Sequence, residues 1–262
     1  MTMRENPSTS VERALTMLDA IGARSAGMTN AEISRALKIP KSSASYILRS
    51  LEKAGYLRRE QAKYRLGLKL LSLRHSALDG LNVRELAMPH LRALSERVKQ
   101  TAHLAILDGA EAVYVEKVDA PSFIKLDTWI GRRIDLHSTS VGKAIAAYLA
   151  APELSAILER RPLRRHTEFT IITPTGFLAE LEKVRRDGYA MDDEENTLGL
   201  RCVAAPVFGA DGRIQASVGV SGIVSQVTTN DIPRIAVEVL QAAQRVSKSM
   251  GYQNAGKSLS RV

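Results

Sequence analysis

Residues 29–57 read TNAEISRALKIPKSSASYILRSLEKAGYL, a stretch that predicts two helices joined by a tight turn. Thr29, with Glu32 three residues later, has the pattern of a capping box, which opens a short helix. Residues 38–40 interrupt the helical spacing, and a longer helix then runs to a stop at Gly55. Two helices with such a turn between them are typical of a helix-turn-helix. The buried stripe of the longer helix is expected at Ala44, Ile47, Leu48 and Leu51.

The segments on either side extend this pattern. A helix is expected before it, behind the capping candidate Ser10, with apolar residues at Val11, Ala14, Leu15 and Leu18. After Gly55, the strand-like runs YLRRE and KYRLG surround Gln61 and Ala62 and predict a basic hairpin. Together these elements predict a winged helix-turn-helix. The alternative is a small helical subdomain with an exposed charged face.

The distribution of charge separates two parts of the chain. Residues 1–78 hold 14 Lys and Arg against 6 Asp and Glu, a net charge of +8. Residues 79–262 hold 23 Lys and Arg against 22 Asp and Glu, a net charge of +1. The first part is therefore predicted to be a winged helix-turn-helix domain that binds DNA and includes the start of a linker helix, and the second part a near-neutral domain.

The candidate DNA contacts lie on the longer helix, at its start and on the hairpin. Short hydroxyl side chains near a helix N-terminus let the backbone approach DNA, and Arg49 can reach a base edge or a phosphate. Cationic hairpin side chains can reach phosphates or the minor groove. Tyr46 can equally pack beside the hairpin. The full set is Thr29, Lys41, Ser42, Ser43, Ser45, Tyr46, Arg49, Arg58, Arg59, Lys63 and Arg65.

The composition limits the class of protein. With 262 residues, of which 45% are hydrophobic and 25% charged, the chain suits ordinary globular domains. The single cysteine excludes an internal disulfide framework. The first residues, MTMRENPSTS, lack the apolar core of a signal peptide, and no run approaches the roughly 18 apolar residues of a membrane span. We therefore expect a cytoplasmic protein with no membrane partner.

The second part mixes strands and helices and predicts an α+β domain that resembles the sensory fold called GAF. Helices over about 67–80 and 83–100 form a linker that can position the two domains and offer a dimer surface. Strands are expected at 102–107, 112–118 and 123–129, and the runs VAAPVF and IQASVGVSG form a hairpin around GADGR. Further helices are expected from near Ser140, at Pro152, over 176–186 with Leu178, Leu181 and Val184 inward, and over 231–250.

Residues 191–202 read MDDEENTLGLRC and place four carboxylates before the only cysteine. A catalytic pair would need two of these carboxylates to face one pocket, but consecutive residues usually point in different directions, so a solvated loop is expected. A metal site could combine Asp192 and Cys202 with His103 or His137, but no ligand spacing supports one. Cys202 is expected to be a small buried hydrophobic residue rather than a nucleophile.

Three further residues have both a functional and a structural interpretation. Lys143 lies in the run TSVGKA, which lacks two residues of a phosphate-binding loop, so we expect a solvated or salt-bridged helix residue. Phe123 and Trp129 could wall a pocket, but they are expected to fill the core.

The chain resembles the IclR family of bacterial transcription regulators over about residues 9–250. In the first domain the resemblance rests on SVERALTMLDAI, on the stretch 29–57 and on YRLG. In the second it rests on LHSTSVGKAIAAYL, TEFTIIT, DDEENTLGLRCVAAPVF and VGVSG. The order and spacing of these motifs together are specific. The resemblance implies a winged helix-turn-helix joined to an effector-binding domain, a homodimer or dimer of dimers, and control of carbon-source catabolism.

The resemblance also implies an effector pocket. Independently of it, a helix that begins near Ser140 would direct free amides and its positive dipole end at an acid group. Asp192 would accept from an effector hydroxyl or hold a donor in place. Where this chain has Gly219 the family often has a serine, so that contact would be lost or made by the backbone. The residues implied are Ser140, Val141, Asp192, Leu200, Cys202, Gly219 and Ser221.

We therefore expect a DNA-binding regulator of a catabolic operon, controlled by a small organic acid, with no cofactor, no metal and no enzymatic activity. Its partners would be double-stranded operator DNA, the effector and further copies of the chain. One alternative is an enzyme acting on a small acid through Cys202 and the acidic run, with a fused DNA-binding domain. The other is an architectural DNA binder that needs no effector.

Overall fold

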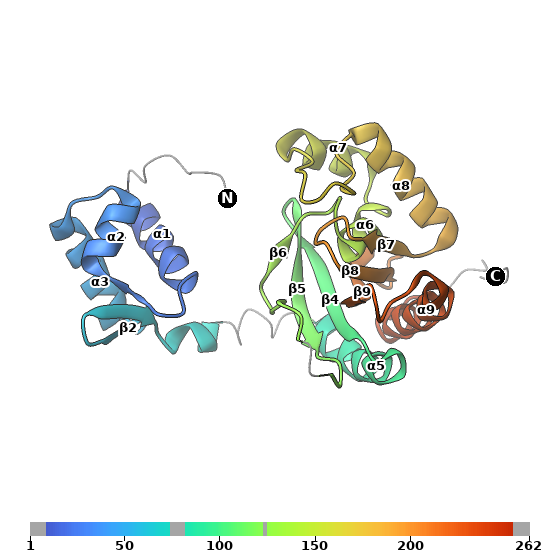
Figure 1. Cartoon of the computed structure of the whole chain (residues 1–262), viewed down its shortest axis with the longest axis horizontal. Helices are drawn as coiled ribbons and strands as arrows, with labels where there is room; N and C mark the ends of the chain where they lie inside the picture. Colours follow the sequence, from blue (N-terminus) through green and yellow to red (C-terminus); the bar gives the residue numbers. More distant parts are fainter. Residues whose placement is uncertain (1–8, 74–81, 123–124, 254–262) are drawn as a thin grey trace. The chain divides into compact units, whose positions relative to one another are not determined.

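The computed structural model describes residues 9–73, 82–122 and 125–253 (Figure 1). Contacts divide the chain into two compact units, Met1–Gly80 and Leu81–Val262. Each unit has its own hydrophobic core.

The first unit is a winged helix-turn-helix, as predicted. Its three helices and its small antiparallel sheet, in the order β1-β3-β2, enclose one core that contains Met17, Ile33, Leu48 and Tyr64. Because the sheet pairs the residues just before the capped helix with the hairpin, it fixes the hairpin against the helices. The elements are α1 (Ser10–Gly22), β1 (Met28–Thr29), α2 (Asn30–Leu37), α3 (Lys41–Lys53), β2 (Leu57–Glu60) and β3 (Lys63–Leu66).

The predicted capping box and turn are both present. The amide of Glu32 donates to Thr29 Oγ1 at 3.3 Å, and the amide of Thr29 donates to Glu32 Oε2 at 2.7 Å. Lys38 then takes the left-handed conformation, with φ 52°, and Ser34 Oγ donates across the turn to the carbonyl of Ile39 at 2.6 Å. These contacts set the turn between α2 and α3.

The first helix was predicted with the wrong cap and with two of its four inward residues wrong; Ala14 and Leu18 pack on the core as predicted. Thr9, not Ser10, caps α1 and forms a capping box with Glu12. Val11 and Leu15 are 69% and 55% exposed. The same helical spacing, started three residues later, gives the stripe that packs on the core, namely Ala14, Met17, Leu18 and Ile21.

The second unit is built on one antiparallel sheet in the order β6-β5-β4-β9-β8-β7. In Figure 1, α5 and α9 lie together on one side of this sheet, and α6, α7 and α8 lie on the other. This is the predicted α+β architecture. The strands are β4 (Thr101–Asp108), β5 (Glu111–Val118), β6 (Arg133–Ile134), β7 (Ala190–Asp193), β8 (Leu200–Phe208) and β9 (Ile214–Ile223). The helices are α5 (Asn82–Val98), α6 (Ser140–Ala146), α7 (Ala151–Arg160), α8 (Pro174–Asp187), η1 (Thr229–Asp231) and α9 (Ile232–Ser249).

Two predictions for this unit were wrong, and two others fall partly or wholly outside the described residues. Residues 125–129 form no strand, and the short edge strand is β6 instead. Trp129 is 54% exposed and lies under the guanidinium of Arg132, 5.0 Å from the ring centre, so it does not fill the core. The helix expected from Gly67 is present at 69–73, while its remainder and Phe123 lie outside the described residues.

The close approach of α6 to the sheet depends on Gly219. A Cβ atom at this position would lie 2.9 Å from Val141 Cγ1 and 2.9 Å from Ala204 Cβ. No ordinary Cβ tolerates such contacts, so a side chain here would push α6 away from β8 and β9. The absence of a side chain at Gly219 therefore allows α6 to pack closely against the sheet.

The inward face of α8 gives a matched test of this core. The apolar spacing predicted Leu178 inward, but Phe177 is buried in its place and Leu178 is 43% exposed, whereas Leu181 is fully buried as predicted. Leu181→Ala should lower the free energy of unfolding by about 2–5 kcal/mol, because it leaves a cavity. Leu178→Ala should lower it by less than about 1 kcal/mol. Denaturant unfolding measures both, and equal losses would contradict the packing described here.

Candidate functional site

The exposed side of α3 presents most of the helix residues expected to contact DNA. Lys41, Ser42, Tyr46 and Arg49 are exposed, and Tyr46, at 70%, does not pack beside the hairpin. Pro40 precedes the helix and provides no side-chain cap. The first-turn amides of α3 are therefore available to an anion such as a phosphate. Ser43 and Ser45 are half-buried.

The hairpin sorts its cations between two faces. Arg58 and Arg65 are paired across β2 and β3, and Lys63 is paired with Glu60, so these side chains share the outward face. Glu60 binds both arginines, Arg58 at 2.7 Å and Arg65 at 2.9 Å, and neutralises part of their charge. Arg59 lies on the other face, 5.8 Å from the ring centre of Tyr64.

Thr29 is placed differently from the other candidates. Its hydroxyl donates to Glu32 Oε2 at 2.9 Å and accepts from the amide of the same residue. A contact between this hydroxyl and DNA would compete with the cap. The structure thus gathers ten of the eleven predicted DNA contacts on α3 and the hairpin, and uses the hydroxyl of Thr29 within the fold.

A second candidate site lies where three strands of the second unit run side by side. Asp192 is paired with Cys202 across β7 and β8, and Cys202 is paired with Ser221 across β8 and β9. Residues directly opposite on neighbouring strands point to the same face of a sheet. The carboxyl, the thiol and the hydroxyl therefore form a row on the face that α6 covers.

A cavity of about 150 Å³ opens at this row, beside the first residue of α6. Five of the seven predicted effector residues line it. Val141 and Gly219 do not: Val141 is buried against the sheet, its carbonyl accepting from Ser217 Oγ at 3.0 Å, and Gly219 lies beneath α6. The lining is Tyr114, Leu126, Asp127, Thr128, Arg132, Ile134, Thr139, Ser140, Asp192, Asn196, Thr197, Leu200, Cys202 and Ser221.

Several of these lining residues were not predicted from any sequence motif. Tyr114 belongs to a strand that was predicted correctly, but it lies far along the chain from the motifs that pointed to a pocket. Leu126 and Thr128 belong to the segment interpreted as a strand, and Arg132 lies beyond its end, in a stretch for which no element was predicted. Thr128 is held there by His103, whose Nε2 lies 2.9 Å from its hydroxyl.

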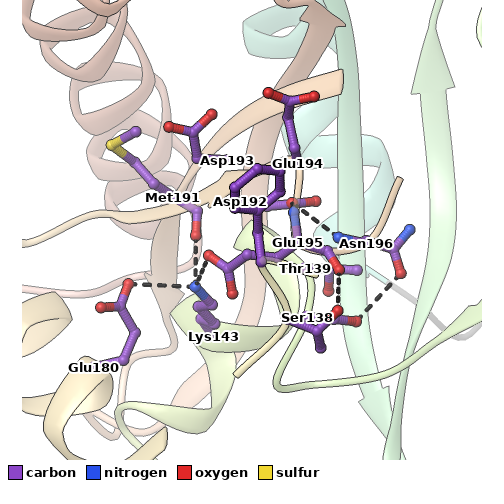
Figure 2. Close-up of polar contacts among 12 residues, drawn as sticks. Ser138, Thr139, Lys143, Glu180, Met191, Asp192, Asp193, Glu194, Glu195 and Asn196 are labelled. Atoms are coloured by element: carbon purple, nitrogen blue, oxygen red, sulfur yellow. Dashed lines mark hydrogen bonds and ion pairs between the residues drawn. The ribbon is translucent and has the colours of Figure 1, made fainter. Parts of the chain in front are cut away.

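The acidic run is not a solvated loop, contrary to expectation. Asp192 is 3% exposed and Glu195 9% exposed, whereas Asp193 binds Arg201 at the surface at 2.7 Å. Figure 2 shows Asp192 and Glu195 within the polar cluster, with Asp193 and Glu194 pointing away from it. The chain turns at Glu194, which has φ 62°. This turn separates the two buried carboxylates from the two outer ones.

The buried part of the run is tied to α6 through Lys143 (Figure 2). This side chain is completely buried, so the solvated alternative is wrong and the salt-bridged one is confirmed. Its Nζ donates to Glu195 Oε1 at 2.5 Å, to the carbonyl of Met191 at 2.9 Å and to Glu180 Oε1 at 3.3 Å. A buried ammonium needs such partners, because losing one leaves an uncompensated charge.

The cavity favours the neutral forms of its acidic groups. Burial raises the pKa of Asp192 to about 7, although Asp192 Oδ1 accepts from the amides of Glu195 and Asn196 at 2.9 and 3.2 Å. Burial also raises the pKa of Cys202 well above its ordinary value, so this thiol is a poor nucleophile at neutral pH. Near pH 7, Asp192 can therefore donate a hydrogen bond in part of the molecules and accept one in the rest.

Neither a metal site nor a membrane span is found in the part of the chain that the structure describes. Within it, no three His, Cys, Asp or Glu side chains are grouped so that they could hold a metal ion. Burial lowers the pKa of His103 to about 3, so its ring is neutral and accompanies Tyr114, 4.6 Å away between ring centres. No helix in the described ranges has the length and apolar character needed to cross a bilayer.

The raised pKa of Asp192 predicts a pH-dependent stability. The unfolded chain loses this proton near the ordinary carboxyl pKa, so the folded state binds more protons between about pH 4 and 7. The free energy of unfolding of the wild type, relative to Asp192→Asn, should therefore fall by roughly 2–3 kcal/mol between pH 5 and 8. Denaturant unfolding at each pH measures it. A fall that persists in Asp192→Asn and disappears in Asp193→Asn would contradict the assignment.

Comparisons with known proteins identify the family to which both units belong. Family models described as "Bacterial transcriptional regulator IclR C-terminal" and "IclR helix-turn-helix domain" match residues 75–248 and 10–61. The HTH-type transcriptional regulator XynR of Escherichia coli (strain K12) is 36% identical over 93% of this chain and 97% of its own length.

Solved structures give the same result. The Thermotoga maritima IclR is 32% identical, with a TM-score of 0.79 over 93% of this chain and 99% of that chain. An IclR homologue from Microbacterium hydrocarbonoxydans, complexed with 4-hydroxybenzoate, is 21% identical and has the same fold, with a TM-score of 0.80 over 92% of this chain and 99% of that chain. These relatives are regulators rather than enzymes, and the chain belongs to the IclR family of DNA-binding bacterial transcriptional regulators.

Proposed function

We propose that this regulator controls a catabolic operon in the cytoplasm and responds to a small organic acid bound in the cavity beside α6. It would act as a homodimer or dimer of dimers on double-stranded operator DNA. The observation that carries the proposal is the row of Asp192, Cys202 and Ser221, which faces Ser140 across a cavity of about 150 Å³.

The chemistry of the cavity favours a small acid that also carries a hydroxyl or carbonyl group. Arg132 supplies a permanent positive charge at the wall, and Ser140 and Ser221 supply hydroxyl donors. Asp192 resists ionisation below about pH 7, so it does not repel an anion there. Leu126, Ile134 and Leu200 leave part of the wall apolar. The relative complexed with 4-hydroxybenzoate is a member of the same fold that holds an acid of this kind.

On the DNA side, α3 would enter the major groove and the hairpin would contact the backbone. Arg49 is exposed on α3, and its Nε donates only a long hydrogen bond, 3.4 Å, to the carbonyl of Ser45. The guanidinium can leave this contact for a base edge at little cost. The cations on the outward face of the hairpin, Arg58, Lys63 and Arg65, suit phosphates.

Arg49 tests whether α3 reads sequence. Arg49→Ala should weaken binding to DNA from just upstream of the regulator's own gene by about 1–3 kcal/mol, with a smaller loss on scrambled DNA. Arg49→Lys keeps the charge but loses the two-pronged geometry, so it should retain non-specific binding and lose discrimination. Titrations at several salt concentrations measure both. An equal loss on both DNAs would make Arg49 a phosphate contact.

Ser140 and Asp192 test the cavity. A panel of small carboxylic acids that includes 4-hydroxybenzoate is titrated onto the protein–operator complex. Ser140→Ala and Asp192→Asn should shift the half-effective concentration of an active acid by about tenfold while leaving DNA affinity without acid unchanged. Ser155→Ala, on the outer part of α7, is the matched control and should respond like the wild type.

Two outcomes would support the rival functions instead. Conversion of the acid into a product, lost in Cys202→Ala, would indicate an enzyme. Specific DNA binding that no acid alters, with Asp192→Asn silent, would indicate an architectural DNA binder.

A further inference from the structure

A second cavity, of about 270 Å³, adjoins the first and is not used by the proposed function. The two share a wall formed by Arg132, Ile134, Asn196 and Thr197. The rest of the second cavity comes from β5, β6, the end of α7 and the segment that follows it. The second cavity is more strongly basic than the first, because four of its lining residues are arginines.

The carboxylates in this second cavity are already engaged by neighbouring arginine and histidine side chains. Glu111 binds Arg161 at 2.6 Å and Arg133 at 3.3 Å, and Arg133 also binds Asp108. Asp135 binds His166 at 2.9 Å and lies 3.8 Å from Arg161. These acids therefore have little capacity left for further positive charge.

Two arginines of the lining take no part in these ion pairs. Within the described part of the chain, neither Arg132 nor Arg164 has a carboxylate partner. Arg132 donates to the carbonyl of Asp127 and lies over Trp129, so its position is fixed while its charge stays uncompensated. Both residues are half-buried and line one concave space. Since residues 79–262 carry a net charge of only +1, this excess is local.

The segment that carries Arg164 is held in place by buried polar contacts. His137 Nε2 lies 2.9 Å from the carbonyl of Arg164, and burial lowers the pKa of His137, so a neutral ring donates this hydrogen bond. Thr167 Oγ1 donates to the carbonyl of Glu194 at 2.7 Å, and Thr170 Oγ1 to that of Glu195 at 2.6 Å. The segment is thus fastened to the same acidic run that forms the first cavity, which lowers the cost of ordering it around a ligand.

We propose that the second cavity is an oxyanion site, in which Arg132 and Arg164 bind a phosphate, sulfate or carboxylate group. A guanidinium offers paired donors that match two oxygens of such a group, and the bond is charge-assisted. The amide of Asn196 and the hydroxyl of Thr197, on the shared wall, add neutral polar groups. The oxyanion is either a separate inorganic ion or the distal group of an effector that extends across the shared wall from the first cavity. Only this second source rests on the proposed function.

Arg164 isolates the site, because it lines the second cavity and not the first. Inorganic phosphate is titrated calorimetrically onto the full-length protein at constant ionic strength, with chloride as the replaced anion. The wild type should show saturable binding that Arg164→Gln weakens by about tenfold or more. Arg164→Lys keeps one charge and should weaken it less. Arg160→Gln, on the same stretch but outside the cavity, is the matched control and should bind like the wild type.

Competition distinguishes the two sources. C4–C6 dicarboxylates that displace phosphate, and whose affinity falls in both Arg164→Gln and Ser140→Ala, would identify the distal group of a long effector. Phosphate and a monocarboxylate that bind together would identify a separate ion. If neither phosphate nor any dicarboxylate shows a saturable component sensitive to Arg164→Gln, the oxyanion site is overturned. The response to monocarboxylates is measured independently, so failure of the first cavity would be seen separately.

Discussion

The buried ammonium of Lys143 is the interaction on which the arrangement of the second unit depends. It lies in the middle of the short helix α6, and it contacts β7 at Met191, the segment after β7 at Glu195, and a carboxylate of α8. An ion pair without solvent is costly to form and more costly to break. This cost fixes one arrangement: α6, the acidic run and α8 must all be in place before the charge is balanced. The cavity beside α6 exists because these three parts are held together.

The same exclusion of water determines which protonation states the acidic groups of the cavity take. A carboxyl that would be fully ionised at the surface is close to half protonated near neutrality at Asp192, and the thiol beside it stays protonated. Neutral groups in a row favour recognition by hydrogen bonding over reaction. The DNA-binding unit works in the opposite way: its polar groups lie on exposed surfaces, where water and salt moderate every contact.

Features that depend on residues close together in the sequence were predicted well, and features that depend on distant residues were not. The helix-turn-helix was predicted closely, because its capping box and its turn join residues within a few positions of each other. The inward face of α1 was predicted only in part, because one amphipathic spacing fits two phases and only tertiary contacts choose between them. The burial of Lys143 and Glu195 could not be predicted either, since these two side chains compensate each other from positions about 50 residues apart in the sequence. Likewise Arg132 and Thr128 reach the cavity through an irregular segment with no periodic pattern.

The packing at Gly219 has a consequence for how such regulators diverge. Val141, Ala204 and position 219 occupy one shared volume, so their sizes cannot change independently. A descendant of this chain that acquires a serine at 219 first needs a smaller residue at 141 or 204. Otherwise the added side chain pushes α6 away from β8 and β9. Mutations that are harmful alone are then tolerated only in a certain order. Which residues this chain can accept at 219 therefore depends on the volumes at positions 141, in α6, and 204, in β8, as well as on the ligand.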